Sequence, residues 1–137
     1  MIRDLLDKKT GQPFVVQEGE SHNVTGSFVD ADGAAINLAS LATFEITLYN
    51  ENGNQIINSK DAQDAKNANG HTVASDGSFI VRLNVADSSI EVEDPVIAEQ
   101  ALQYHILRLV WTWSDGVAVR TGIEQLRFAV QKLEVTV

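Results

Sequence analysis

Four short turn signals, each ending in glycine, divide this chain of 137 residues. They are Asp30-Ala31-Asp32-Gly33, Asn52-Gly53, Asp76-Gly77 and Asp115-Gly116. Asn-Gly and Asp-Gly pairs readily adopt the positive φ angles that tight hairpins need. Between the turns, apolar residues alternate with polar ones, as they do in strands that bury one face. The sequence therefore predicts a small all-β domain built largely from antiparallel hairpins.

The alternating segments indicate which side chains form the core. The clearest strand runs from Phe44 to Tyr49, and others follow the Asp76-Gly77 turn and precede the Asp115-Gly116 turn. With about seven to nine short strands, the pattern is typical of an antiparallel β-sandwich. The lack of cysteine excludes an antibody-type domain, but an immunoglobulin-like topology without the disulfide stays open. The core candidates are Phe44, Ile46, Leu48, Phe79, Val81, Leu83, Leu107, Leu109, Trp111, Trp113 and Phe128.

The remaining segments suggest how the domain is organised. Residues 1–20 are interpreted as an N-terminal arm, polar to about residue 11, followed by an edge strand that begins at Pro13. The sandwich is expected over residues 21–137, with a C-terminal extension from about 131. Asp94-Pro95 resembles the start of a short helix over roughly 95–102. The polar loop 60–70 has no hydrophobic stripe, so we expect it to be mobile.

Composition excludes several classes of function. The formal net charge of −9 and the scattered Lys and Arg residues argue against sequence-independent binding to nucleic acid. The absence of cysteine excludes disulfides, thiol catalysis and Cys-ligated zinc. No apolar run approaches the roughly 18 residues of a membrane helix, and the first residues lack the apolar centre of a signal peptide. We therefore expect synthesis in a cytoplasm, with no membrane partner.

The carboxylates of Asp30 and Asp32 are of the type that binds calcium, but their spacing favours a turn. A helix–loop–helix calcium loop has glycine at position six and glutamate at position twelve. Counting from Asp30, glycine is fourth and the twelfth residue is Leu41. The segment is therefore interpreted as turn chemistry.

No set of residues has the spacing of a catalytic or metal site, so we expect neither an enzyme nor a cofactor. Ser21 lies in a near match to the nucleophile elbow, but Asn23 replaces the second glycine. Glu91 and Glu93 point to one side of an extended segment, as at a solvated edge. The histidines have no metal-ligand spacing, and one of them shares the face of Leu107; they are His22, His71 and His105.

Two tryptophans allow two interpretations. Trp111 and Trp113 lie two residues apart on one strand, which is the spacing of a sugar-stacking platform. They also share the face of Leu107 and Leu109, which favours a place in the core.

The stretch from Thr25 to Ala129 resembles the immunoglobulin-like domain of tailed-bacteriophage virion proteins, including baseplate upper-protein domains. Four groups of short sequence segments carry the resemblance, which covers about three-quarters of the chain. They are Gly26 to Gly33 with Ile36-Asn37-Leu38, Phe44-Glu45-Ile46, Ala74 to Phe79 with Val81 and Leu83, and Tyr104 to Thr112 with Ser114-Asp115-Gly116 and Arg120-Thr121-Gly122.

The resemblance implies a non-enzymatic structural or assembly protein of the virion, at the head, neck, tail or baseplate. Its partners would be other virion proteins, and a homo-oligomer or a symmetric array in the particle is expected. Extended termini would make the contacts by adding strands to neighbouring sheets. The interaction candidates are Ile2, Leu5, Leu6, Val135 and Val137. The alternative is a carbohydrate-binding or adhesin-like module.

Overall fold

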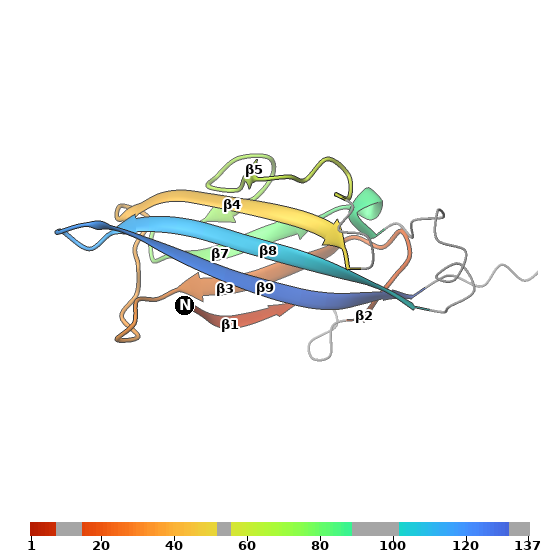
Figure 1. The fold of residues 1–137 in the computed structure, drawn as a ribbon, viewed down its shortest axis with the longest axis horizontal. Helices are drawn as coiled ribbons and strands as arrows, with labels where there is room; N and C mark the ends of the chain where they lie inside the picture. Colours follow the sequence, from red (N-terminus) through yellow and green to blue (C-terminus); the bar gives the residue numbers. More distant parts are fainter. Residues whose placement is uncertain (8–14, 52–55, 89–101, 132–137) are drawn as a thin grey trace, which may run out of the picture.

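Two β-sheets pack face to face in the computed structural model, which describes residues 1–7, 15–51, 56–88 and 102–131 (Figure 1). The four-stranded sheet has the order β1 (Ile2–Asp7), β3 (His22–Phe28), β7 (Ser78–Leu83), β6 (Thr72–Val73). The five-stranded sheet has the order β2 (Val15–Gln17), β9 (Val119–Gln131), β8 (Leu102–Ser114), β4 (Leu41–Asn50), β5 (Gln63–Asp64). A 3₁₀ helix, η1 (Val85–Ser88), follows β7.

The strand order is that of an immunoglobulin-like sandwich. The first sheet has the A-B-E-D order, and β9, β8 and β4 have the G-F-C order of the second, with β5 added beside β4. The described pairings are antiparallel, except that β2 pairs with the end of β9 in parallel. The N-terminal part of the chain therefore contributes an edge strand to each sheet.

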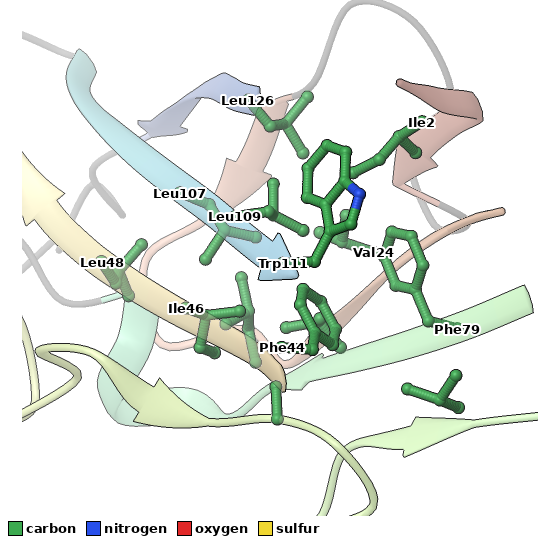
Figure 2. Close-up of a cluster of buried hydrophobic side chains, with 14 of the residues drawn as sticks. Ile2, Val24, Phe44, Ile46, Leu48, Phe79, Leu107, Leu109, Trp111 and Leu126 are labelled. Carbon is green, nitrogen blue, oxygen red and sulfur yellow. The ribbon is translucent and has the colours of Figure 1, made fainter. Parts of the chain in front are cut away.

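The core lies between the sheets and is rich in aromatic rings (Figure 2). The rings of Phe28, Phe44, Phe79 and Trp111 pack with centroids 4.9 to 5.2 Å apart. Trp113 is only partly buried and packs against the edge of the core. The other core candidates are all buried, with at most 2% of each residue exposed: Phe44, Ile46, Leu48, Phe79, Val81, Leu83, Leu107, Leu109, Trp111 and Phe128.

The N-terminal residues do not form the expected arm. Residues 2–7 are the edge strand β1, which pairs with β3 from Ile2↔Phe28 to Asp7↔Val24. Ile2 is 6% exposed and lies over Gly26, where an added Cβ would be 2.6 Å from its Cγ2 atom. Deleting residues 1–11 would therefore remove a strand and a core residue. The arm prediction failed because the charged residues between the apolar ones masked a strand.

The polar loop after β4 is also anchored, which corrects the prediction of a mobile segment. Ile57 and Ala65 are fully buried, and their N–H groups donate to the Leu48 and Phe44 carbonyls at 2.9 and 2.8 Å. The segment thus runs along the outer edge of β4. Several of its residues have left-handed backbone angles, which Asn tolerates better than most residues: Asn58, Ser59, Ala62, Asn67 and Asn69.

Three other predictions concern residues at or beyond the ends of the described ranges. The strand predicted from Pro13 appears as β2, Val15–Gln17, at the edge of the five-stranded sheet. The helix predicted over roughly 95–102 lies outside the described residues, apart from Leu102, which begins β8. The C-terminal candidates Val135 and Val137 lie outside them as well.

Candidate functional site

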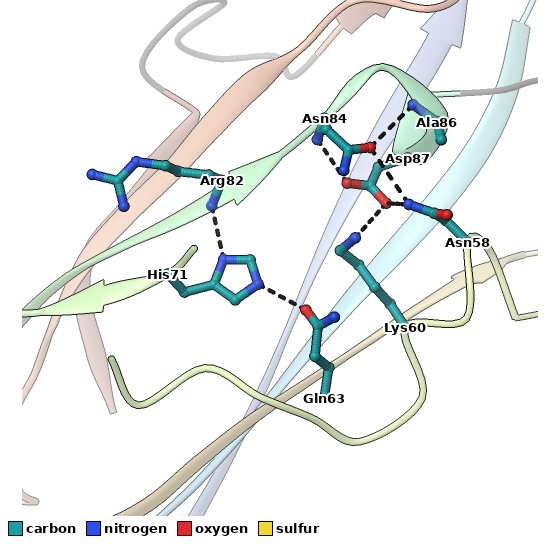
Figure 3. Close-up of polar contacts among 8 residues, drawn as sticks. All are labelled: Asn58, Lys60, Gln63, His71, Arg82, Asn84, Ala86 and Asp87. Carbon is teal, nitrogen blue, oxygen red and sulfur yellow. Dashed lines mark hydrogen bonds and ion pairs between the residues drawn. The ribbon is translucent and has the colours of Figure 1, made fainter. Parts of the chain in front are cut away.

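A buried ion pair joins the anchored loop to η1 (Figure 3). Lys60 Nζ lies 2.8 Å from Asp87 Oδ1, and the two side chains are 6% and 0% exposed. Asp87 also accepts hydrogen bonds from Asn58 Nδ2 at 2.9 Å and from the Asn84 N–H at 2.7 Å. Both carboxylate oxygens therefore have donors inside the protein, as a buried charge requires.

His71 lies beside this pair and links β7 to β5. Its Nδ1 atom accepts the Arg82 N–H at 3.1 Å, so Nε2 carries the proton and donates to Gln63 Oε1 at 2.8 Å. Burial lowers the pKa of His71, and the nearby Lys60 charge lowers it further. The contacts hold the imidazole in its neutral form.

The polar cluster (Asn58, Lys60, Gln63, His71, Arg82, Asn84 and Asp87) stabilises the fold around a buried centre. Its ion pair and imidazole are enclosed, with Lys60 at 5%, His71 at 2% and Asp87 at 0% exposure. A reacting group needs to reach its substrate. These three side chains instead bind the loop to the β7–η1 corner, and we place no chemistry on them.

The neutral state of His71 makes stability depend on pH. The pKa of His71 in the folded protein lies below that of an unperturbed histidine, about 6.5. Below about pH 6.5 the unfolded chain therefore gains a proton that the folded chain resists. This contribution is complete above that pH and is lost as pH falls toward the folded pKa. We expect the free energy of unfolding to fall as the pH drops below about 6.5, with this residue supplying at most about 1.4 kcal/mol per pH unit.

The matched variant is His71→Gln, which cannot titrate. Urea unfolding at several pH values should give a shallower pH dependence for this variant, while His22 and His105 remain in both proteins. Identical slopes would mean that His71 is free to protonate in the fold.

The β8–β9 hairpin projects at one end of the sandwich (Figure 1). Residues of this hairpin line an open groove. We call it the loop-end groove, and it has a volume of about 1210 Å³. It is lined by Met1 and parts of segment 30–36, together with the β8–β9 turn and residues 119–123. Trp111 and Trp113 contribute from β8.

Two of the predicted turns shape the groove. Asp30 Oδ1 accepts the N–H groups of Asp32 and Ala34 at 2.9 and 3.0 Å, and Gly33 has φ +81°. In the second turn, Asp115 Oδ1 accepts the N–H groups of Val117 and Ala118, both at 2.8 Å. These side chain–backbone bonds are why Asp occupies the first position of each turn.

The second turn carries a fixed charge pair. Arg120 Nε donates to Asp115 Oδ2 at 2.8 Å. The Ala118 N–H, the Arg120 guanidinium and the Val117 N–H hold the pKa of Asp115 well below its usual range. The carboxylate stays ionised throughout the physiological pH range, so the hairpin tip keeps its geometry.

Exposed apolar side chains lie in and beside the groove. Met1, Val119 and Ile123 line it and are 65%, 68% and 57% exposed, and Val117 at the hairpin tip is 93% exposed. Such a group around a concave surface is typical of a contact site for another molecule. Sequence reasoning missed these residues. A signal was available, because Val119 and Ile123 alternate out of phase with Leu126 and Phe128.

The structure separates the two tryptophans. Trp111 is 1% exposed, so the pair does not form a sugar-stacking platform. Trp113 is partly buried and lines the groove. Among the N-terminal interaction candidates, Ile2 is a core residue and Leu5 packs against the core. Leu6 lies in β1, paired with Thr25. Ile2 and Leu5 therefore stabilise the fold, and the burial of Ile2 corrects its prediction as a contact residue.

The predicted polar candidates are scattered. His22, His71 and His105 are all buried, and His105 Nε2 contacts Gln103 Oε1 at 3.0 Å. Glu91 and Glu93 lie outside the described residues. Within the part of the chain that the structure describes, no group of three or more His, Asp or Glu side chains is arranged to hold a metal ion. No helix in that part is long and apolar enough to span a membrane.

Comparison with known proteins assigns no family to this chain. No protein-family model matches the chain, and no curated protein is significantly similar to it.

Proposed function

We propose that this protein is a non-enzymatic binding and assembly protein that acts through the loop-end groove. The observation that carries the proposal is the cluster of exposed apolar side chains, Met1, Val117, Val119 and Ile123, around that groove. Hydrophobic side chains grouped in this way lose water when a partner covers them, which favours association. The rigid turns beside them lower the entropy cost of binding.

The proposed setting is the particle of a tailed bacteriophage. Support comes from the sequence phrases that resemble phage immunoglobulin-like domains, together with the sandwich on which they lie. The proposed partners are other virion proteins, and contact through a symmetric array would present the groove many times in one particle. The carbohydrate-binding alternative retains only Trp113 as an aromatic residue in the groove, since Trp111 is buried.

Particle incorporation tests the proposal. A phage that lacks this gene is complemented with the wild-type chain or a variant, and the purified particles are quantified by peptide mass spectrometry. We expect the wild-type chain at a fixed copy number. The Val119→Asp chain should be reduced by about tenfold, the effect of about 1.4 kcal/mol at an interface residue.

The control is Val85→Asp, at a residue that is 61% exposed in η1, at the opposite end of the sandwich (Figure 1). It adds the same charge at a comparably exposed valine and should be incorporated normally. Absence of the wild-type chain from clean particles would overturn the virion setting. Equal incorporation of both variants would overturn the role of the groove.

A further inference from the structure

The loop-end groove runs along an edge of β9 that carries no neighbouring strand among the described residues. On its outer side, β9 pairs with β2 only at Ala129–Gln131. Residues 119–123 of the same strand line the groove. Unpaired strand edges bind extended chains readily, because their backbone groups are already aligned.

The direction of the backbone groups at this edge follows from the far end of β9. The Glu18 N–H donates to the Gln131 carbonyl at 2.8 Å, so the backbone groups of Gln131 point to the outer edge. The β8–β9 register is unbroken from Leu102↔Gln131 to Ser114↔Val119. Because alternate residues of a strand point their N–H and C=O groups to the same edge, those of Thr121 and Ile123 face the groove.

The charges around the groove indicate which kind of segment fits. Its side chains include three carboxylates, Asp30, Asp32 and Asp115, and one guanidinium, Arg120, which is paired with Asp115. Asp30 and Asp32 form no ion pair with any described residue. The Met1 ammonium is a second positive charge at the groove, and it donates to the Val29 carbonyl at 3.1 Å. Nearby, the Glu124 carboxylate accepts the Ile2 N–H. The groove therefore favours a cationic partner.

We infer that the groove receives an extended segment of a partner protein, with alternating basic and apolar residues, which adds to the outer edge of β9 as a further strand. Successive side chains of such a strand point to opposite faces. Apolar residues on one face would pack beside Val119 and Ile123. Lys or Arg residues on the other would approach Asp30 and Asp32. This inference rests on the proposed function and names the chemistry of the partner.

Synthetic peptides test the inference on the full chain. The probe is acetyl-Lys-Val-Lys-Val-Lys-amide, and the matched control peptide has Glu in place of each Lys. Binding is followed by amide shifts in NMR spectra of the ¹⁵N-labelled protein and by tryptophan fluorescence, because Trp113 lines the groove. We expect the Lys peptide to bind at least about tenfold more tightly than the Glu peptide, with shifts concentrated at residues 119–123.

Two pairs of variants separate edge pairing from general attraction. Thr121→Pro removes an N–H that points away from β8, a change that edge strands tolerate, whereas Thr121→Val keeps it. We expect the first to abolish binding and the second to retain it. Asp32→Lys should weaken binding of the Lys peptide, whereas Asp61→Lys, at an exposed residue outside the groove lining, should not. The Asp32 pair keeps the test decisive if the proline variant fails to fold.

Equal binding of the two peptides would overturn the inference, as would full binding by folded Thr121→Pro protein or shifts confined to other strands. Such results would leave the proposed function standing if Val119→Asp still fails to enter particles. Normal incorporation of Val119→Asp together with selective binding of the Lys peptide would overturn the proposed function and leave this inference standing. The groove would then be a peptide site that particle assembly does not use.

Discussion

Replacing Asp87 by alanine is expected to lower the free energy of unfolding by about 3–5 kcal/mol, the usual cost of breaking a buried ion pair. Asp87 is fully buried and forms an ion pair with Lys60. Its carboxylate also accepts hydrogen bonds from the Asn58 side chain and the Asn84 N–H. Removing its carboxylate leaves the Lys60 ammonium buried without its counter-charge and the Asn84 N–H without its acceptor. Urea unfolding monitored by circular dichroism measures the loss.

Lys60→Met is the informative companion. It keeps much of the length of the side chain, and Asp87 retains the hydrogen bonds from Asn58 and Asn84. We therefore expect a smaller loss than in Asp87→Ala. In the double variant the unpaired ammonium is gone, so its cost should be less than the sum of the two single losses. Strictly additive losses would mean that Lys60 and Asp87 do not form the pair in solution.

Strands and turns were predictable because their signals are local. The alternation of Phe44, Ile46 and Leu48 needs only the period of two and a buried face. The turn at Asp115-Gly116 follows from the side chain of one residue and from the positive φ of the next, +91°. Both features appear in the sequence within a few residues, and both are found in the structure.

The anchored loop was not predictable by the same reasoning. The burial of Lys60 in this loop depends on its ion pair with Asp87, which is 27 positions later in the chain. A polar segment without a hydrophobic stripe resembles a solvated loop until its distant partner is known. The N-terminal strand failed for a related reason, because β1 is recognised only by its pairing with β3.

The groove could be inferred from the sequence only in part. Its turns were predicted, but Met1, segment 30–36 and the start of β9 come together only through the sandwich topology. Trp111 and Trp113 share a strand face, and alternation alone does not distinguish a buried ring from a partly exposed one. Their difference depends on position along β8, since Trp113 lies next to the last residue of that strand.

Gly122→Ala is expected to destabilise the fold by about 3 kcal/mol, the upper part of the range for overpacking a core. Trp111 is paired with Phe44 on one side and with Gly122 on the other. A Cβ atom on Gly122 would lie 2.3 Å from the Trp111 Cε2 and Cζ2 atoms. These atoms belong to a rigid ring in the aromatic core, so the indole has to move. Urea unfolding measures the loss, and acrylamide quenching of tryptophan fluorescence reports exposure of the displaced ring.

Whether Gly122→Ala destabilises or stabilises the protein shows whether the added methyl group meets the Trp111 ring. Gly122 has no positive φ, so its backbone accepts alanine. Without a clash, the substitution would stabilise the protein by about 0.4–1 kcal/mol through the unfolded state. Thr121→Ala, at the exposed neighbouring residue, controls for strand propensity. Combining Gly122→Ala with Trp111→Phe should cost less than the sum of the single changes, because a smaller ring leaves room for the methyl group. A stabilised Gly122→Ala protein with unchanged quenching would show that the indole does not pack on this glycine.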